Sequence, residues 1–552
     1  MKGEVMPRQK NKSSFLTQGI VLAAASVIVR LIGLIYRIPL TRIIGDDGNG
    51  AYSNAFEVYN IALLLSTYSI PTAMSKLISE REDKKEYRNS THLLQVAIIF
   101  AAAIGAVASL LLFFGANLIS GVIYKEADFS TAIPLRVLAP TIFVFSVMGV
   151  IRGYFQGKHT VLPTSVSQIF EQIVNAVVSV VAAQYFIKKY SASEKVSAYG
   201  AAGGTLGTLS GALVAFLFLG FLLLAYVPYL KKKVKRDKHE NVEENGALLR
   251  ILLYTMIPIV LNQTVYSLSS FLDSFLMNQI FAYKGISEAE RRIMFGRYSG
   301  KYRLLTNAPI AIASAIGMAV IPSVVQAHIS KDKELLHNRI AQAVKLNMLI
   351  AFPCAGGLCA LAEPIMYAIF ADSGEALSMT SRMMYIGALS VVFFAYSTTT
   401  NSILQGVGLL KKPVLHGVIS LAVYLVVDIL LLAFSPFGVY SLVIGNMLFP
   451  LLISIMNYFT LKKELDYKQE VERTFIRIAL CTGFMSVLSL ICYRGCLFLC
   501  KSAKLSLVVA IPFAVILYFV LAIGFRAVTE DELLDLPKGT LLVKIAKKLH
   551  LM

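Results

Sequence analysis

Long apolar stretches alternate with short polar ones along nearly the whole chain. Runs of roughly 18 or more apolar residues, the length that an α-helix needs to cross the hydrocarbon core of a bilayer, recur from residue 16 to residue 525. We count about fourteen of them by this length rule. The pattern therefore predicts an all-α membrane protein with about fourteen transmembrane helices.

The composition agrees with this pattern. Of the 552 residues, 56% are hydrophobic and only 15% are charged, and the mean hydropathy is +0.67. These values exclude an ordinary soluble protein.

The distribution of charge predicts an orientation. In a soluble protein a formal net charge of +19 would suggest a nucleic-acid partner. Here the Lys and Arg residues lie mostly in short loops between apolar runs, so we expect the positive-inside rule to explain them and expect no nucleic-acid partner. With the N-terminus inside, the basic loops fall on one side, which places both termini in the cytoplasm. Three outer loops, around Lys188, Arg291 and Lys501, run against this trend.

Two pairs of matching segments indicate an internal repeat. "IPTAMSKLIS" at residues 70–79 matches "IPSVVQAHIS" at residues 321–330, and "YFQGKHTVLP", which ends at Pro163, matches "ILQGVGLLKKP", which ends at Pro413. The two pairs have nearly the same offset, a shift of six predicted helices. Because an even shift makes the copies parallel, the repeat predicts two parallel six-helix bundles with a substrate site between them.

The repeat also sets the predicted domain boundaries. The predicted parts are an N-terminal six-helix lobe at 14–230, a basic cytoplasmic linker at 231–246, a C-terminal six-helix lobe at 247–462, two further helices within 474–525, and a cytoplasmic amphipathic tail at 529–552. In the tail, apolar residues at helical spacing stand beside Lys544, Lys547 and Lys548. This spacing is typical of a helix on an anionic membrane surface and also fits an amphipathic packing helix.

Arginines lie inside the first predicted helix. The stretch "SVIVRLIGLIYRIPLTRIIG" at residues 26–45 contains Arg30, Arg37 and Arg42. A charged side chain at membrane depth costs at least about 2.5 kcal/mol on insertion scales, so it usually faces a partner or a wet cavity. Arg30 and Arg37 are seven residues apart, on one helix face and about 10 Å apart along the axis. We expect Arg30 to line a cavity and Arg42 to reach the outer interface, and Arg37 fits either place.

Uncharged polar residues also recur at helical spacing in other predicted helices. A single Ser, Asn or Gln in a membrane helix usually forms an interhelical hydrogen bond. Several polar stripes that converge with arginines instead favour a water-filled cavity. The candidate substrate-binding residues are Arg30, Arg37, Gln168, Glu171, Asn175, Asn262, Asp273, Lys301, Arg303 and Asn307.

The chemistry of this set favours an anionic substrate, because arginine presents its donors in a fork that matches phosphate oxygens. The intramembrane carboxylates either pair with the arginines or take up a proton or Na⁺ during transport; they are Glu57, Glu171, Asp273 and Asp428. The sequence contains no nucleotide-binding loop and no hydrolytic or metal-binding motif. We therefore expect no enzyme activity and no cofactor, with energy supplied by Na⁺ or H⁺ gradients, the membrane potential or substrate flux.

One long segment carries a family signature. Residues 149–172, "GVIRGYFQGKHTVLPTSVSQIFEQ", resemble the pattern RGxxQGxxxxxPTxxSQxxEQ of bacterial polysaccharide exporters. These are the stage V sporulation protein B and lipid II flippase MurJ branches of the multidrug/oligosaccharidyl-lipid/polysaccharide (MOP) superfamily. "RLIGLIYRIPLTRIIG" resembles the first helix of that family, and "GKYRLLTNAPIAIASAIGMAVIPS" resembles the eighth, with Arg303 at the position of a cavity arginine and a one-residue gap before Pro309.

The resemblance implies the MATE- and MurJ-like fold, with two six-helix bundles and two extra helices, and a flippase of the bacterial plasma membrane. Such a protein carries undecaprenyl-pyrophosphate-linked glycans, such as lipid II in peptidoglycan biosynthesis or a sporulation precursor, by alternating access. Its partners would be a lipid-linked oligosaccharide diphosphate and membrane lipids, and we expect a monomer. Two positions depart from MurJ: Tyr36 and Arg37 replace an Arg-Asp pair, and only Lys76 stands near a helix 2 arginine.

Other functions fit parts of the sequence. A multidrug or cation antiporter would share the fold but would need carboxylates and aromatic residues at its site. An exporter of another lipid-linked polysaccharide would share both the fold and the site. A membrane-bound glycosyltransferase or polymerase would need acidic residues at one membrane face. "GDDGNG" at residues 45–50 is the candidate for that role, and we interpret it as a turn.

Overall fold

The chain is all-helical wherever its structure is described. The computed structural model describes residues 10–237, 242–530 and 539–548, and within these ranges it contains helices and turns but no strand. By its internal contacts it divides into two compact units, Met1–Gly296 (unit 1) and Arg297–Met552 (unit 2). The all-α prediction is confirmed.

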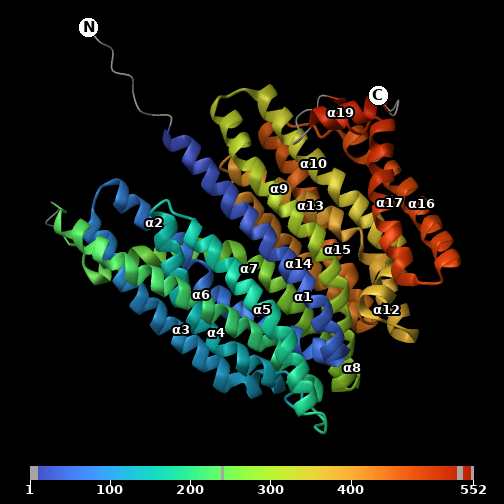
Figure 1. The fold of residues 1–552 in the computed structure, drawn as a ribbon, viewed down its shortest axis with the longest axis horizontal. Helices are drawn as coiled ribbons and strands as arrows, with labels where there is room; N and C mark the ends of the chain where they lie inside the picture. Colours follow the sequence, from blue (N-terminus) through green and yellow to red (C-terminus); the bar gives the residue numbers. More distant parts are fainter. Residues whose placement is uncertain (1–9, 238–241, 531–538, 549–552) are drawn as a thin grey trace. The chain divides into compact units, whose positions relative to one another are not determined.

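Unit 1 is built from long helices that run side by side, as α3, α4, α5 and α6 show in Figure 1. Its elements are α1 (Lys10–Leu63), the π-helix η1 (Leu64–Tyr68), α2 (Ile70–Asp83), α3 (Tyr87–Ile123), α4 (Ala132–Gly157), α5 (Leu162–Lys189), α6 (Val196–Lys235), α7 (Asn245–Tyr283) and α8 (Glu288–Arg297).

The first two predicted spans meet at a single residue. Gly45 (φ 68°, ψ 179°) leaves the helical conformation inside α1, and residues 46–50 are already helical. Glycine adopts this left-handed φ without a steric penalty, so the chain changes direction in one residue. The interpretation of "GDDGNG" as a turn is therefore wrong for all but its first residue. Its acidic pair lies in a helix, where Asp47 accepts a hydrogen bond from Ser197 of α6.

Small residues let the helices of unit 1 approach closely. A Cβ added to Gly203, Gly207 or Gly211 of α6 would lie 2.1–2.6 Å from the nearest atom of α5. The four-residue spacing puts these glycines on one face, the arrangement that allows close packing of membrane helices. This contact fixes the face of α5 that carries Glu171 and Asn175, because the Gly211 position abuts the carbonyl of Glu171.

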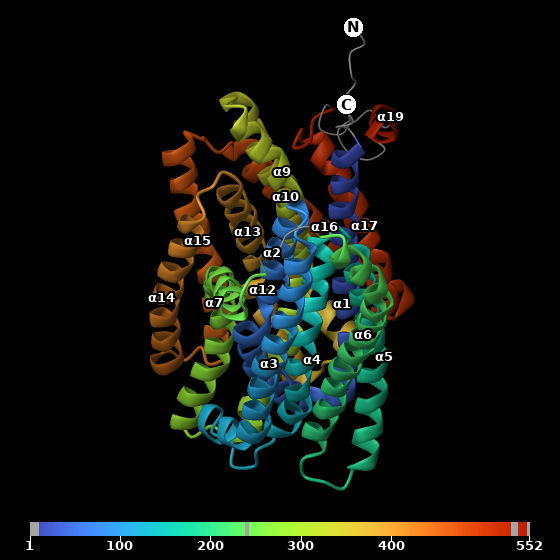
Figure 2. The ribbon, with the colours of Figure 1, turned by 90° about the vertical axis from the view of Figure 1, so that its left-hand side faces the viewer.

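Unit 2 contains four π-helical or short helical interruptions among longer helices. Its elements are η2 (Tyr298–Arg303), α9 (Leu304–Ile329), α10 (Lys333–Ala360), α11 (Ala362–Ile365), η3 (Met366–Phe370), α12 (Gly374–Gly387), α13 (Ser390–Gly406), α14 (Lys411–Phe434), α15 (Tyr440–Leu465), η4 (Glu472–Ile476), α16 (Arg477–Cys500), α17 (Ala503–Gly524) and α19 (Gly539–Lys548). Helices α14 and α15 run side by side in Figure 2, as α16 and α17 do in Figure 1.

The Gln-Gly segments of the proposed repeat have the same backbone structure in the two units. After α4, His159 has a φ of 57° and the N–H of Thr160 donates to the carbonyl of Phe155. After α13, Gly408 has a φ of 84° and the N–H of Leu409 donates to the carbonyl of Leu404. Each helix thus ends on a left-handed residue three positions after the glutamine, with the same hydrogen bond to the carbonyl five residues earlier.

Ten helices of the described residues are long and apolar enough to cross a membrane, and the bent pair α12–α13, with an angle of 42°, makes an eleventh. Helix α1, with its break at Gly45, and helix α7 are not among these eleven. The fourteen spans predicted from the sequence therefore stay a prediction, while the multi-span helical architecture is confirmed.

The division into units falls later than the predicted lobe boundary. The described parts of the predicted linker at 231–246 lie on unit 1: α6 continues to Lys235, and Glu243 pairs with Arg81 at 2.5 Å between Oε2 and Nη2. Helix α7 then packs against α1, α2 and α3, which places it in unit 1 by contacts. The predicted six-helix lobes are defined by a sequence repeat, whereas the two units are defined by contacts. The units therefore do not test the predicted lobes, which stay a prediction.

The two extra helices and the tail belong to unit 2. Helices α16 and α17 lie at the ranges predicted for the extra pair. In the tail, α19 buries Val543 in the hydrophobic core of the unit, beside residues of α10, α16 and α17. Lys547 of α19 pairs with Glu530. The packing interpretation of the tail is therefore supported by its described side chains.

Candidate functional site

Helix α1 presents two of the predicted arginines on its surface. Arg30 is exposed and Arg37 is half-buried in unit 1. The guanidinium carbon of Arg37 lies 4.1 Å from the centroid of the Tyr52 ring, a cation–π contact within α1 across its break. The aromatic ring therefore positions the Arg37 guanidinium while part of it stays accessible.

Helix α5 carries a polar stripe that faces α1. Asn175 donates from Nδ2 to the hydroxyl of Tyr36 at 3.3 Å, and its Oδ1 accepts from Ser179 at 2.9 Å. Two turns earlier along the same stripe, Gln168 is half-buried, and its Oε1 has no hydrogen-bond partner among the described residues. The hydroxyl of Tyr36 thus connects α1 to α5.

Glu171 of this stripe is neutralised by an arginine of α4. Arg152 donates from Nη2 to Oε2 of Glu171 at 2.8 Å and from Nε to Ser167 at 3.1 Å. Arg152 is buried, so a charge there requires a partner. We did not predict Arg152 as a site residue, although it opens the quoted signature and lies 19 residues before the signature's glutamate.

Lys301, predicted for the substrate site, is buried in an ion pair. Its ammonium contacts Asp372, which follows η3, and the other oxygen of Asp372 accepts from Thr380 of α12 at 2.9 Å. The pair connects η2 to the segment before α12. This partner could not be identified from the sequence, because the two residues are 71 positions apart.

Arg303 ends the π-helix η2 and is half-buried, with its guanidinium carbon 5.8 Å from the centroid of the Tyr298 ring. One turn later, Asn307 is exposed. A π-helical turn accommodates one more residue than an α-helical turn. The π-turn at η2 therefore holds one residue more than an α-helical turn directly before the predicted site residue Arg303.

The predicted residues of α7 are only partly described. The side chain of Asn262 lies outside the described residues. Asp273 is buried, and its neighbour Ser274 donates to Oδ1 of Asn54 in α1 at 2.7 Å. Near Ser274, the polar stripe of α7 therefore packs against α1.

The structure also reveals a buried cluster around Arg292 of α8 that the sequence analysis missed. Nε of Arg292 lies 2.7 Å from Asp47 Oδ1, and its Nη1 lies 3.1 Å from Asp128 Oδ2 and 3.6 Å from Glu126 Oε1. Glu126 also accepts hydrogen bonds from Ser120 and from the N–H and hydroxyl of Thr131. One cation thus holds three carboxylates from α1 and the loop between α3 and α4.

The two acids of that loop have opposite pKa shifts. Burial raises the pKa of Glu126, and the hydrogen bonds from Ser120 and Thr131 and the charge of Arg292 only partly offset it. For Asp128, burial also acts to raise the pKa, but the hydrogen bonds from Ser130 and the charge of Arg292 outweigh it and leave the pKa lowered.

The cations therefore fall into two groups with different chemical capacities. Arg152, Arg292 and Lys301 are buried and paired with carboxylates. Arg30, Arg37 and Arg303 keep accessible surface and can offer donors to a phosphate or carboxylate. Within the described residues, no group of three or more His, Cys, Asp and Glu could hold a metal ion.

The comparisons with known proteins bear on this arrangement. The sequence profile of the family described as polysaccharide biosynthesis protein matches residues 15–328, and the MatE profile matches residues 304–430. The chain belongs to the polysaccharide biosynthesis protein family. Its family is part of the MOP superfamily, and the chain is a transporter of that superfamily.

The similar proteins named below agree with this membership. Stage V sporulation protein B of Bacillus subtilis is 23% identical over 533 residues, which cover 95% of this chain and 98% of that protein. Lipid II flippase MurJ of Bacillus subtilis is 24% identical over 431 residues, 76% of this chain and 77% of that protein. Among solved structures, lipid II flippase MurJ in an inward closed conformation superposes with a TM-score of 0.64 at 16% identity, covering 92% of this chain and 99% of that one. The last likeness shows the fold.

Proposed function

We propose that this polysaccharide biosynthesis protein is a flippase that moves an undecaprenyl-pyrophosphate-linked glycan precursor across the bacterial plasma membrane by alternating access. The lipid-linked diphosphate would be its main partner, together with the lipids of the membrane, and the protein would act as a monomer with both termini in the cytoplasm. Lipid II, a spore cortex precursor and another lipid-linked polysaccharide are the cargoes that fit this chemistry.

The observation that carries the proposal is the accessible pair Arg30 and Arg37 on α1. A guanidinium inside a membrane helix is expensive unless it meets a wet or anionic environment. Arg37 is positioned by Tyr52 without a carboxylate contact in the described structure, and Arg30 stays exposed. Two guanidinium groups at about 10 Å spacing along one helix are suited to a diphosphate headgroup, which carries several phosphate oxygens.

Further proposed ligands share the property of accessible surface. In unit 1 this is Gln168 of α5, and in unit 2 these are Arg303 and Asn307. Asn175 is buried and hydrogen-bonded between α5 and α1, so we propose that it positions these helices. Lys301 and Glu171 are less suited to direct contact with cargo, because their charges are already paired with Asp372 and Arg152. We propose that these two pairs shape the site rather than bind the phosphates.

The proposal is tested by complementation in a strain depleted of its cell-wall flippase. The native chain should restore growth and remove the lipid-linked intermediate that accumulates, and the mass of that intermediate identifies the cargo. Arg30→Ala and Arg303→Ala should each abolish rescue at normal protein levels. Arg42→Ala is the matched control, since Arg42 is an exposed arginine of the same helix and should keep rescue. Rescue by both site variants would contradict the proposed site.

A cation antiporter is the second candidate, favoured by the match of residues 304–430 to the MatE family. Such a transporter would recognise a positive substrate, for which accessible arginines are unfavourable. Vesicle uptake of an ethidium-like cation distinguishes the two functions. Proton- or Na⁺-driven ethidium export by the native chain, retained in Arg30→Ala, would favour the antiporter over the flippase.

A further inference from the structure

Unit 2 contains an apolar groove whose lining residues include no arginine. Four elements form it, namely α10, α13, α15 and η4, and its cavity measures about 490 Å³. Its walls carry aromatic and aliphatic side chains, among them Phe352, Val392, Tyr396, Ile455, Phe459 and Phe475.

The groove runs from the core of the unit to its surface. At the bottom, Val392 and Tyr396 are only 4% and 7% exposed. At the mouth, Ile455 and Phe459 of α15 are 44% and 60% exposed, and Val471 before η4 is 52% exposed. Because α13, α15 and the η4–α16 run belong to the candidate membrane spans, a bilayer around these helices would place hydrocarbon at this apolar mouth.

A dry, apolar groove of this kind is suited to a hydrocarbon chain. An apolar cavity does not retain water, since water needs polar partners that these walls lack. The polar groups gather at one end, where the Tyr467 hydroxyl donates to Oε1 of Gln469 and Gln469 borders the groove. A ligand that is apolar along most of its length and polar at one end would fit both parts.

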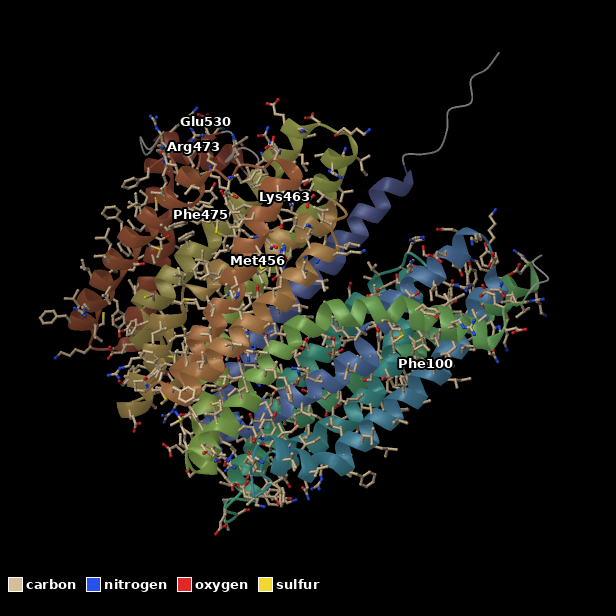
Figure 3. All side chains as sticks on the ribbon, turned by 180° about the vertical axis from the view of Figure 1, so that it is seen from behind. Phe100, Met456, Lys463, Arg473, Phe475 and Glu530 are labelled. Carbon is tan, nitrogen blue, oxygen red and sulfur yellow. The ribbon has the colours of Figure 1, made fainter. Side chains whose placement is uncertain are left out.

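Basic side chains surround that polar end. Lys463 follows Phe459 by four residues on α15, so the two share a helix face, and Lys468 directly precedes Gln469. Figure 3 shows Lys463 at the same end of unit 2 as Arg473 and Phe475. Lys463 and Lys468 are exposed and make no ion pair with any described residue.

The nearby carboxylates leave this end with a net positive charge. Glu464 pairs with Lys412, Glu470 with Arg473 and Glu472 with Arg477. Besides these pairs, Lys462, Lys463 and Lys468 face a single further acid, Asp466, in the segment between α15 and η4. Basic side chains next to a membrane attract anionic headgroups with about 1 kcal/mol each.

We propose that this groove is a binding site for one acyl chain of an anionic phospholipid, whose phosphate lies at Lys463 and Lys468. None of its lining residues is an arginine proposed for the cargo, and the proposal does not depend on the flippase assignment. A chain in the groove would contact α10, α13, α15 and η4 together, so it would brace the π-helical start of α16 against the rest of unit 2.

The absence of tryptophan from the sequence allows a direct test. Phe459→Trp places one fluorophore at the mouth of the groove, and Phe221→Trp, at a 70% exposed position of α6, is the matched control. Each variant is reconstituted in phosphatidylcholine vesicles with increasing fractions of phosphatidylglycerol whose acyl chains are brominated at carbons 9 and 10. Brominated phosphatidylcholine serves as the neutral quencher.

At the groove, half-maximal quenching should need about thirtyfold less brominated phosphatidylglycerol than brominated phosphatidylcholine, the ratio expected for two basic contacts at about 1 kcal/mol each. The two lipids should quench the Phe221→Trp protein equally. Adding Lys463→Gln and Lys468→Gln to the groove reporter should remove the preference. Ser454→Leu, which fills the groove from α15, should remove it too while the lysines remain.

Three results would overturn the proposal. Equal quenching by both lipids at the groove would mean ordinary contact with surrounding lipid. An unchanged preference in the Ser454→Leu protein would mean that the headgroup is held at the surface with no chain in the groove. Displacement of the brominated lipid by an equimolar amount of undecaprenyl phosphate would mean that the groove prefers a polyprenyl chain. Circular dichroism of each variant confirms its helical fold.

Discussion

Arg292 and Arg30 are both arginines of unit 1, yet their surroundings have little in common. Arg292 is buried and lies within 4 Å of three carboxylates contributed by two separate segments. Arg30 is exposed on a helix that the sequence marks as membrane-spanning. A buried cation enclosed by acids stabilises the fold and has no capacity left for a ligand, whereas an exposed cation at membrane depth retains that capacity. Burial and contact with carboxylates therefore distinguish structural charges from candidate site charges, whereas position in the sequence does not.

Removal of the buried cation, Arg292, should have the largest effect on stability. Arg292→Ala leaves Asp47 and Glu126 without their positive partner, and the loss of one member of a buried ion pair costs about 3–5 kcal/mol. The free energy of unfolding in detergent should fall by that amount. The variant Arg292→Lys should lose less, because it retains the charge while giving up the two-armed contact. A stability equal to that of the native chain would show that the cluster is not structural.

The ion pair of unit 2 offers a smaller test of the same rule. Lys301→Ala should destabilise by about 3 kcal/mol, because it leaves the Asp372 carboxylate buried without its counter-charge. The double variant Lys301→Met, Asp372→Leu replaces both charges by apolar groups and should recover much of the lost stability. Denaturant unfolding of the three proteins measures the effect. A double variant less stable than the single one would argue that Lys301 has a further role.

The pH dependence of the Arg292 cluster gives a finer comparison. The folded-state pKa of Asp128 is lowered, so its contribution to stability is present above the pKa of the unfolded chain, about 3.9, and is lost as the pH falls through the lower folded pKa. The folded-state pKa of Glu126 is raised, so the folded protein gains stability as the pH falls through it.

The variants Glu126→Gln and Asp128→Asn distinguish these opposite effects of pH on stability. Relative to Glu126→Gln, the native chain should become more stable as the pH is lowered from 7 towards 4. Relative to Asp128→Asn, it should become less stable as the pH is lowered below about 3.9. Unfolding curves at a series of pH values measure both differences. The same sign for both variants would contradict the assigned environments.

The smallest expected change in stability belongs to the accessible arginines. Arg30→Ala should alter the free energy of unfolding by no more than about 0.5 kcal/mol, the usual range for surface positions, while it abolishes transport. Transport and stability measured on the same protein preparation provide the comparison. A loss of several kcal/mol would place Arg30 with Arg292 among the structural charges.

The sequence predicts the features that are local or periodic. Apolar runs predict the helices, and the Gln-Gly segments predict a repeat that reappears as two identical helix ends at His159 and Gly408. The close contact of Gly203, Gly207 and Gly211 with α5 was not predicted, because their spacing does not indicate the partner helix.

Hydrogen bonds and ion pairs between residues far apart in the sequence could not be predicted. Arg291 and Arg292 counted as charges of an outer loop, yet they lie in α8, where Arg291 donates to the carbonyls of Ile286, Tyr124 and Lys125. Lys301 was predicted as a substrate ligand because the sequence does not show that Asp372 is its ion-pair partner. Periodicity shows which face a residue occupies, and only the tertiary structure shows whether an opposite charge already stands there.

The π-helix η2 gives the neighbourhood of Arg303 a tolerance for a change of one residue in chain length. Successive residues of an α-helix are rotated by about 100°, so an insertion into a regular helix turns every side chain beyond it, whereas a π-turn absorbs one extra residue within a single turn. Deleting Gly300 would therefore convert the π-turn into an α-turn and leave the side chains on either side pointing in nearly the same directions.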